Sequence, residues 1–253
     1  MSTVLAMYGL RGGTGVSTLL AGLADALHAL QQRVLLVDMS PDNLLGLHFN
    51  LPFIEPTGWA RAQVEGSDWR DAAFAVEDGL TVVPYGRLDL VGISSVEQQL
   101  AARPELWSQR IEALSADVDW VLFDLPSHLP AHAASVLRHA RCDMGLQVVN
   151  VDSGSHALLQ RPELRERAQD WLLVNRYDPG RQLQRDLMQL WLHQFDARLV
   201  PQPVHEDGSA PEALASKLPI RRHAPASLAA ADLDSLAVWC LTRANLDPDE
   251  ARG

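Results

Sequence analysis

Lysine is almost absent from this chain of 253 residues, in which Lys217 is the single example. Cysteine is nearly as scarce, since only Cys142 and Cys240 occur, about a hundred residues apart, which excludes a disulfide framework or a metal cluster. No apolar run reaches the roughly 18 residues that a membrane span needs. Any positive charge that meets a bound ligand must therefore come almost entirely from arginine.

Positive charge is also the minority sign, because 21 Lys and Arg stand against 32 Asp and Glu, for a formal net charge of −11. A protein with this negative net charge has no general electrostatic attraction to nucleic-acid phosphates or anionic lipid. Residues 1–7 carry no charged leader segment, so no secretory signal is expected. We expect a cytoplasmic protein that binds no nucleic acid and contacts a membrane only through partners.

Short apolar runs alternate with helix-length segments along the chain, which is typical of a mostly parallel sheet covered on both faces. The predicted strands are 4–8, 34–37, 80–83, 120–123, 144–149 and 171–174. The predicted helices are 16–31, 97–114, 131–139, 181–195 and 227–245. The sequence predicts a three-layer α/β/α fold, with residues 1–245 as one domain and 246–253 as a flexible acidic tail.

The first predicted strand runs into a glycine-rich loop that opens the first helix. Its residues are Arg11, Gly12, Gly13, Thr14, Gly15, Val16, Ser17 and Thr18. In the pattern G-x-x-x-x-G-K-[ST], backbone N–H groups cradle phosphates, the lysine reaches the β and γ oxygens, and the hydroxyl holds Mg²⁺. Here Val16 takes the lysine position and Ser17 keeps the hydroxyl. The alternative is a simple tight connection between strand and helix.

Two aspartates end predicted strands near this loop. Asp38 closes the run that begins at Val34, and Asp124 closes the run that begins at Trp120. Ligands of parallel sheets bind at the carboxyl ends of the strands, where such carboxylates can hold Mg²⁺ through its waters. Together with Ser17 they form the predicted metal site. The alternative for each aspartate is a helix N-cap.

These features resemble the deviant Walker A ATPases, a P-loop NTPase group that includes septum-positioning and plasmid-partition proteins. The signature lysine of that group corresponds to Arg11, and its second acidic motif to Asp124 in Phe-Asp-Leu-Pro. Its water-positioning aspartate corresponds to Ser40, so the catalytic position is degenerate. The resemblance implies that ATP and Mg²⁺ bind in a homodimer that sandwiches the nucleotide, with Arg11 reaching across to the other subunit.

Further stretches resemble the BcsQ family of cellulose biosynthesis proteins and cover most of the chain in order. They include residues 41–45, 58–62, 68–72, 124–126, 149–152, 190–192 and 215–219. The resemblance implies a role in bacterial cellulose secretion, with BcsR, BcsE and the inner-membrane cellulose synthase complex as partners. It also implies a cytoplasmic protein recruited to the inner membrane face, with a cell pole as one location.

The nucleotide base is predicted to lie near the end of the last strand. Asn175 there resembles the adenine contact of the group, followed by Arg176, and Asp207 belongs to a loop that closes over adenine in relatives. Arg176 and Asp178 leave open a guanine-binding N-K-x-D pattern.

Combined with the ATP-bound dimer that the resemblance implies, the two departures from the family pattern predict a dimer that lasts a long time. Val16 offers no charge to the phosphates and Ser40 no carboxylate to the attacking water, so hydrolysis should be very slow or absent. The alternatives are a turnover ATPase of the MinD and ParA positioning type, or a nucleotide-free adapter.

His128 and His132 are expected in a solvated loop, because Pro130 interrupts a helical zinc-binding spacing. Trp59 and Trp69 could form either a partner surface or the core.

Overall fold

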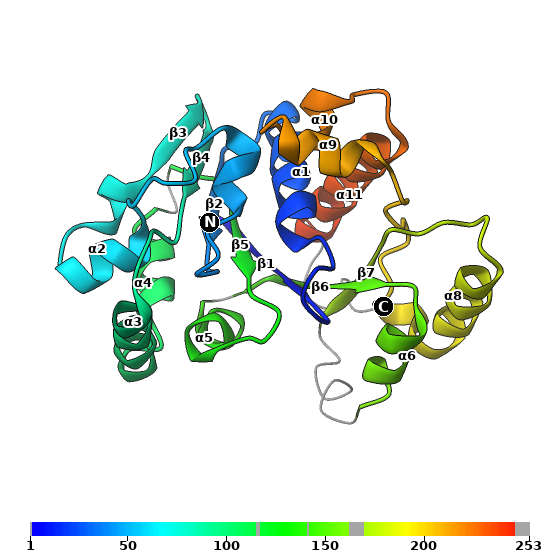
Figure 1. Cartoon of the computed structure of the whole chain (residues 1–253), viewed down its shortest axis with the longest axis horizontal. Coiled ribbons are helices and arrows are strands. Elements are labelled where there is room, and N and C mark those ends of the chain that lie inside the picture. The colour runs from blue at the N-terminus through cyan, green and yellow to red at the C-terminus, as the bar shows by residue number, and fades with distance from the viewer. Residues whose placement is uncertain (1, 115–116, 141, 162–169, 246–253) are drawn as a thin grey trace.

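A computed structural model describes residues 2–114, 117–140, 142–161 and 170–245. Within these ranges seven strands form one sheet in the order β3-β4-β2-β5-β1-β6-β7 (Figure 1). The strands are β1 Thr3–Gly9, β2 Val34–Asp38, β3 Phe74–Glu77, β4 Leu80–Val83, β5 Trp120–Leu125, β6 Met144–Asn150 and β7 Trp171–Asn175. Neighbouring strands pair in parallel except for β3, which is antiparallel to β4. This arrangement confirms the predicted fold class.

Helices cover both faces of the sheet. The longer ones are α1 Val16–Ala29, α3 Leu90–Ala102, α5 Ala131–His139, α8 Gln182–Phe195 and α11 Leu228–Ala244. The shorter ones are α2 Trp59–Glu65, α4 Leu106–Glu112, α6 Ser153–Leu159, α9 Ser209–Ala215 and α10 Ile220–His223, with 3-10 turns η1 Leu45–Phe49, η2 Trp69–Ala72 and η3 Asp196–Arg198. Figure 1 shows α1, α9, α10 and α11 on one side of the sheet and α3, α4 and α5 on the other.

The core follows the alternation of side chains along the strands. Leu5 and Met7 of β1 pack with α1 and α11, whereas Ala6 and Tyr8 pack with the helices of the opposite layer. Successive strand residues point to opposite faces, so a strand buried on both sides is apolar throughout. This is why the interior strands could be predicted as uninterrupted apolar runs.

The helix predicted over residues 97–114 is two helices, because Pro104 separates α3 from α4. The residue before a proline is disfavoured in helical geometry, and Arg103 has φ −133° and ψ 70°. Strand β3 lies outside the predicted set. It is at the edge of the sheet, and its side chains alternate between half-buried and exposed, so it is not buried on both faces as the predicted strands are.

The structure settles the position of two tryptophans that the sequence left open and overturns the expectation for one histidine. Trp59 and Trp69 are both buried and pack in the core. The expectation that His132 lies in a solvated loop was wrong, because it is buried in the first turn of α5. Its Nδ1 pairs with Glu97 of α3, and its Nε2 lies 2.8 Å from the carbonyl oxygen of Met39. Buried polar atoms need such partners, and these make the position stable.

The predicted tail, residues 246–253, lies outside the described residues. Among the described helices, none combines the length and the apolar character needed to cross a bilayer.

Candidate functional site

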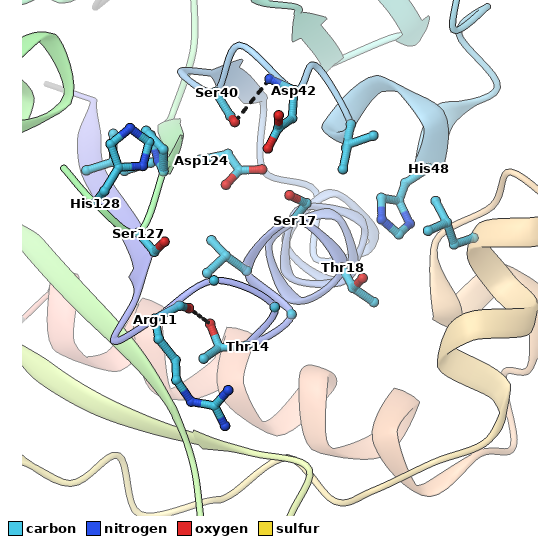
Figure 2. A pocket seen from close by; sticks show the side chains of 18 of the residues that line it. Arg11, Thr14, Ser17, Thr18, Ser40, Asp42, His48, Asp124, Ser127 and His128 are labelled. Atoms are coloured by element: carbon cyan, nitrogen blue, oxygen red, sulfur yellow. Dashed lines mark hydrogen bonds between the residues drawn. The ribbon is translucent and has the colours of Figure 1, made fainter. Parts of the chain in front are cut away.

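A cavity of about 300 Å³ lies at the carboxyl ends of β1, β2 and β5 (Figure 2). Most of the predicted site residues line it, namely Arg11, Gly12, Gly13, Thr14, Gly15, Val16, Ser17, Thr18, Ser40, Asp124 and Arg176. The parallel pairing of β1 with β5, and of β2 with β5, brings the loops that follow these strands to one edge. A ligand is expected at such an edge of an α/β sheet.

The glycine-rich loop forms a cradle at the start of α1. Gly13 and Gly15 have φ of 77° and 94°, a left-handed conformation that favours glycine. A Cβ at Gly15 would lie 2.6 Å from Nδ2 of Asn175, whereas the space beside Gly13 is open. No side chain of the N-cap residue caps the first turn of α1, so its free N–H groups are available to an anion. This geometry suits a phosphate group.

Asp124 and Ser17 are two polar residues beside the cradle. The Ser17 hydroxyl lies on the same side of the cavity as Asp124, whose Oδ2 is buried and has no partner among the described residues. Burial raises the pKa of Asp124 to about 7, and the nearby Ser17 hydroxyl only partly opposes this shift. A buried carboxylate oxygen without a partner, next to a hydroxyl, fits a hard cation such as Mg²⁺.

Asp38 lies behind the cavity and does not line it. It is directly opposite Asp124 in the pairing of β2 with β5. Its Oδ1 accepts a hydrogen bond from the backbone of Ser40 at 2.8 Å, and its Oδ2 accepts one from Leu45 at 3.1 Å. Burial and the neighbouring Asp124 raise its pKa well above the ordinary value. These bonds resemble the N-cap alternative, and a role in holding Mg²⁺ stays a prediction.

Arg11 points away from Ser17 and Asp124 (Figure 2). Its guanidinium forms an ion pair of 2.5 Å with Oδ2 of Asp152, which also caps α6 by accepting a hydrogen bond from the backbone of Ser155. Partial burial acts to raise the pKa of Asp152, but these bonds outweigh it and lower that pKa. The side chain of Arg11 is 45% exposed, so the pair lies at the surface of the molecule.

The two positions that depart from an ATPase pattern are neutral in the structure. Val16 packs against the core cluster around α1. The hydroxyl of Ser40 accepts a hydrogen bond of 3.3 Å from the backbone of Asp42, which orders the loop after β2 (Figure 2). Neither side chain brings charge to the cavity.

A second cavity of about 350 Å³ adjoins the first, and the two share Gly15, Thr18, Arg176 and Leu214. Asn175 and Asp207 line it. Nδ2 of Asn175 donates to the carbonyl oxygen of Thr14 at 2.7 Å, which ties the end of β7 to the glycine-rich loop.

Asp207 is held by the backbone N–H groups of Ser209, at 2.8 Å, and Ala229, at 3.2 Å. Partial burial acts to raise its pKa, but these bonds lower the pKa below the ordinary value. Its carboxylate therefore stabilises the loop over the second cavity.

Two residues near the site were not predicted. His48 of η1 lines the first cavity, and its Nδ1 is buried without a partner among the described residues. Burial lowers the pKa of His48 to about 4, so the ring is neutral at pH 7. Asp152 was missed as the partner of Arg11. No local pattern in the sequence indicates that His48 lines the cavity or that Asp152 pairs with Arg11.

A family model described as "Cellulose biosynthesis protein BcsQ" matches residues 1–241. The chain belongs to the BcsQ family. It is 38% identical over 250 residues to the cellulose biosynthesis protein BcsQ of Escherichia coli strain K12, an alignment that covers 94% of each chain. The predicted family resemblance is thereby confirmed over nearly the whole sequence.

Solved structures of MinD and ParA type P-loop NTPases share the fold. The septum site-determining protein MinD of Pyrococcus horikoshii, complexed with Mg-ADP, matches with a TM-score of 0.74 at 20% identity, covering 97% of this chain and 98% of its own. The cobyrinic acid a,c-diamide synthase of Mycobacterium smegmatis, with bound ATP analog and magnesium, matches with a TM-score of 0.75 at 20% identity, covering 96% of each chain. This member of the BcsQ family thus has the P-loop NTPase fold.

Proposed function

We propose that this member of the BcsQ family binds ATP with Mg²⁺, dimerises around the nucleotide, and acts as a regulatory or assembly subunit of the bacterial cellulose secretion system. The observation that carries the proposal is the pairing of an intact phosphate cradle with the unpartnered Oδ2 of Asp124 beside Ser17, among the residues described. The two similar structures with bound nucleotide and magnesium support ATP and Mg²⁺ as the ligands.

Each part of the site has a role in this proposal. The N–H groups of the loop from Gly12 to Thr18 hold the phosphates, while Ser17 and Asp124 hold Mg²⁺, with Asp38 behind them. Bound Mg²⁺ would neutralise phosphate charge. The second cavity takes the base between Asn175 and the loop that Asp207 stabilises.

Hydrolysis is proposed to be very slow or absent. Phosphoryl transfer needs positive charge on the β and γ oxygens and a group that orients the attacking water. Val16 and Ser40 supply neither, because one is apolar and the other carries only a hydroxyl. Nucleotide would then hold the protein in one state for a long time, which suits a subunit that assembles other proteins.

The partners follow from the family and remain proposals. They are a second copy of this chain, the small protein BcsR, BcsE and the inner-membrane cellulose synthase complex. The protein would work in the cytoplasm and reach the inner membrane face, at a cell pole or elsewhere, through these partners. The membership in a cellulose biosynthesis family supports this assignment.

A thermal-shift titration with ATP and Mg²⁺ tests nucleotide binding. A ligand that binds only the folded protein at 100 times its Kd should raise the Tm by roughly 5 to 10 °C. In the Ser17→Ala variant, Mg²⁺ should add little to the rise in Tm that the nucleotide causes, because the variant lacks the hydroxyl ligand. An unchanged wild-type Tm would favour the nucleotide-free adapter.

Steady-state hydrolysis separates a long-lived switch from a turnover ATPase. The wild type should release phosphate far more slowly than a relative that keeps both the loop lysine and the second aspartate, assayed in parallel. Equal rates would contradict the roles assigned to Val16 and Ser40 and would favour the MinD and ParA type of function.

A further inference from the structure

The first cavity, which the proposed function assigns to the nucleotide phosphates, has Val16 where related loops carry a lysine. The other cations that line this cavity therefore determine how the charge of a bound polyphosphate is neutralised. Among the described residues that line it, the arginines are Arg11 and Arg176. Arg11 is paired with Asp152 at 2.5 Å and points away from Ser17 and Asp124 (Figure 2). Of these two arginines, Arg176 is the one whose charge no described carboxylate neutralises.

Arg176 has an unusual backbone conformation for its residue type. Its φ of 55° lies in the left-handed region, where residues other than glycine, asparagine and aspartate are uncommon. Such conformations persist when the surroundings enforce them, and they cluster at ligand-binding sites. The conformation of Arg176 is therefore typical of a residue at a ligand-binding site.

The neighbours of Arg176 hold it on both sides. Nδ2 of Asn175 donates to the carbonyl oxygen of Thr14 in the phosphate loop at 2.7 Å. The backbone N–H of Tyr177 donates to the carbonyl oxygen of Val204 at 3.1 Å, in the segment that lines the second cavity. The left-handed residue is therefore placed between the phosphate loop and the predicted base-binding loop.

The side chain of Arg176 is exposed and lines both cavities where they adjoin. It makes no side-chain hydrogen bond or ion pair to any other residue that the structure describes. No contact with another described residue therefore explains why the side chain lies there. At the junction of the two cavities, the guanidinium borders the space that a nucleotide would occupy. Guanidinium groups bind phosphate oxygens strongly, through charge-assisted and often bidentate hydrogen bonds.

We propose that Arg176 supplies, from the same chain, the positive charge on the nucleotide phosphates that Val16 cannot supply. This inference rests on the proposed function, because it assumes that ATP or ADP fills the two cavities. It differs from the sequence-based expectation, in which Arg176 follows the base contact Asn175. The charge of the guanidinium, rather than its carbon stem, then determines affinity.

Three substitutions separate charge from shape. Arg176→Lys keeps the charge, Arg176→Met keeps a long apolar stem without charge, and Arg176→Asn removes both while tolerating the left-handed conformation. In titrations of each protein with ADP and Mg²⁺, the Lys variant should lose less affinity than the other two, because it keeps the charge but not the planar guanidinium. The Met and Asn variants should bind roughly 10-fold or more weakly, as expected for a lost hydrogen bond to a charged group.

Two further measurements guard against a merely structural effect. The Asn variant without nucleotide should have a Tm no lower than wild type, because asparagine adopts this backbone conformation readily. Arg181→Asn removes an exposed arginine that lines neither cavity, and it should leave the Kd unchanged. Raising the salt concentration should weaken ADP binding less in the Met and Asn variants than in wild type.

The outcomes are distinct. Wild-type affinity in the Met variant, or equal losses in the Lys and Met variants, would overturn the phosphate role of Arg176 and leave the proposed function intact. Failure of the wild type itself to bind ADP or ATP would overturn the proposed function, and this inference with it.

Discussion

Two buried carboxyl groups lie side by side where β2 and β5 end. Asp38 and Asp124 are opposite each other in the strand pairing, and their exposed fractions are only 0% and 3%. Asp38 is satisfied by two backbone N–H groups, whereas Oδ2 of Asp124 has no partner among the described residues. Burial disfavours the charged form, so Asp124 should hold a proton more tightly in the folded protein than in the unfolded chain.

This shift predicts how stability without nucleotide or Mg²⁺ depends on pH. The pKa of Asp124 is about 7 in the fold and about 3.9 for an unfolded aspartate, so the folded state binds more protons between these values. Wild type should therefore lose stability as pH rises from 5 to 8, by roughly 2 to 4 kcal/mol from this group. Asp124→Asn removes the contribution of Asp124 and leaves that of Asp38, whose pKa is also raised by burial, and urea unfolding at both pH values measures the difference.

Asp119 offers a matched control for the pH experiment. Its hydrogen bond and ion pair with Arg33 lower its pKa, so it stays ionised from pH 5 to 8 in both states. The stability difference between Asp119→Asn and wild type should then be constant over this range. A constant difference for Asp124→Asn as well would show that burial does not raise its pKa.

At the scale of elements, two loops approach each other closely on the β2 and β4 side of the sheet. A Cβ at Gly58, the residue before α2, would lie 2.1 Å from the backbone nitrogen of Gly86. Gly58 has an extended backbone, so the constraint is space rather than conformation. Trp59 follows at once, and its Nε1 donates to the carbonyl oxygen of Asp38 at 2.7 Å.

Gly58→Ala should therefore destabilise the protein by about 3 kcal/mol or more, since backbone atoms cannot move aside as a flexible side chain can. Gly208→Ala is the control, because its added Cβ meets nothing within 4 Å and its φ of −63° suits alanine. Chemical denaturation of both variants measures the two effects. Equal stability of the two variants would contradict the close approach.

The strands that could be predicted are those that are mostly buried on both faces. Each of the six predicted apolar runs is a strand, because strands covered on both faces are apolar throughout. Edge strand β3 and the break at Pro104 depend on partial burial and on a single residue, and both were missed. A sequence pattern predicts a strand best when burial requires an apolar side chain at nearly every position of the strand.

Some contacts in the candidate site could likewise be predicted from the sequence, and others could not. The meeting of the glycine-rich loop with Asp124 could be predicted, since parallel strands bring their carboxyl ends to one edge. The pairing of Arg11 with Asp152 joins residues 141 positions apart, and the contact of His132 with Met39 joins residues 93 positions apart. Such contacts depend on how the layers pack, which no local pattern encodes.

At the scale of the whole molecule, the ion pair between Arg11 and Asp152 competes with any contact of Arg11 across a dimer interface. Asp152→Asn removes the pair but keeps the oxygen that caps α6, so it should lower the protein concentration needed for dimerisation with ATP and Mg²⁺ by up to about fivefold. Arg11→Ala should raise that concentration roughly 10-fold or more. Light scattering over a dilution series measures both, with Arg33→Ala as an exposed control paired to Asp119. An unaffected dimer in Arg11→Ala would rule out the role of Arg11 across the interface.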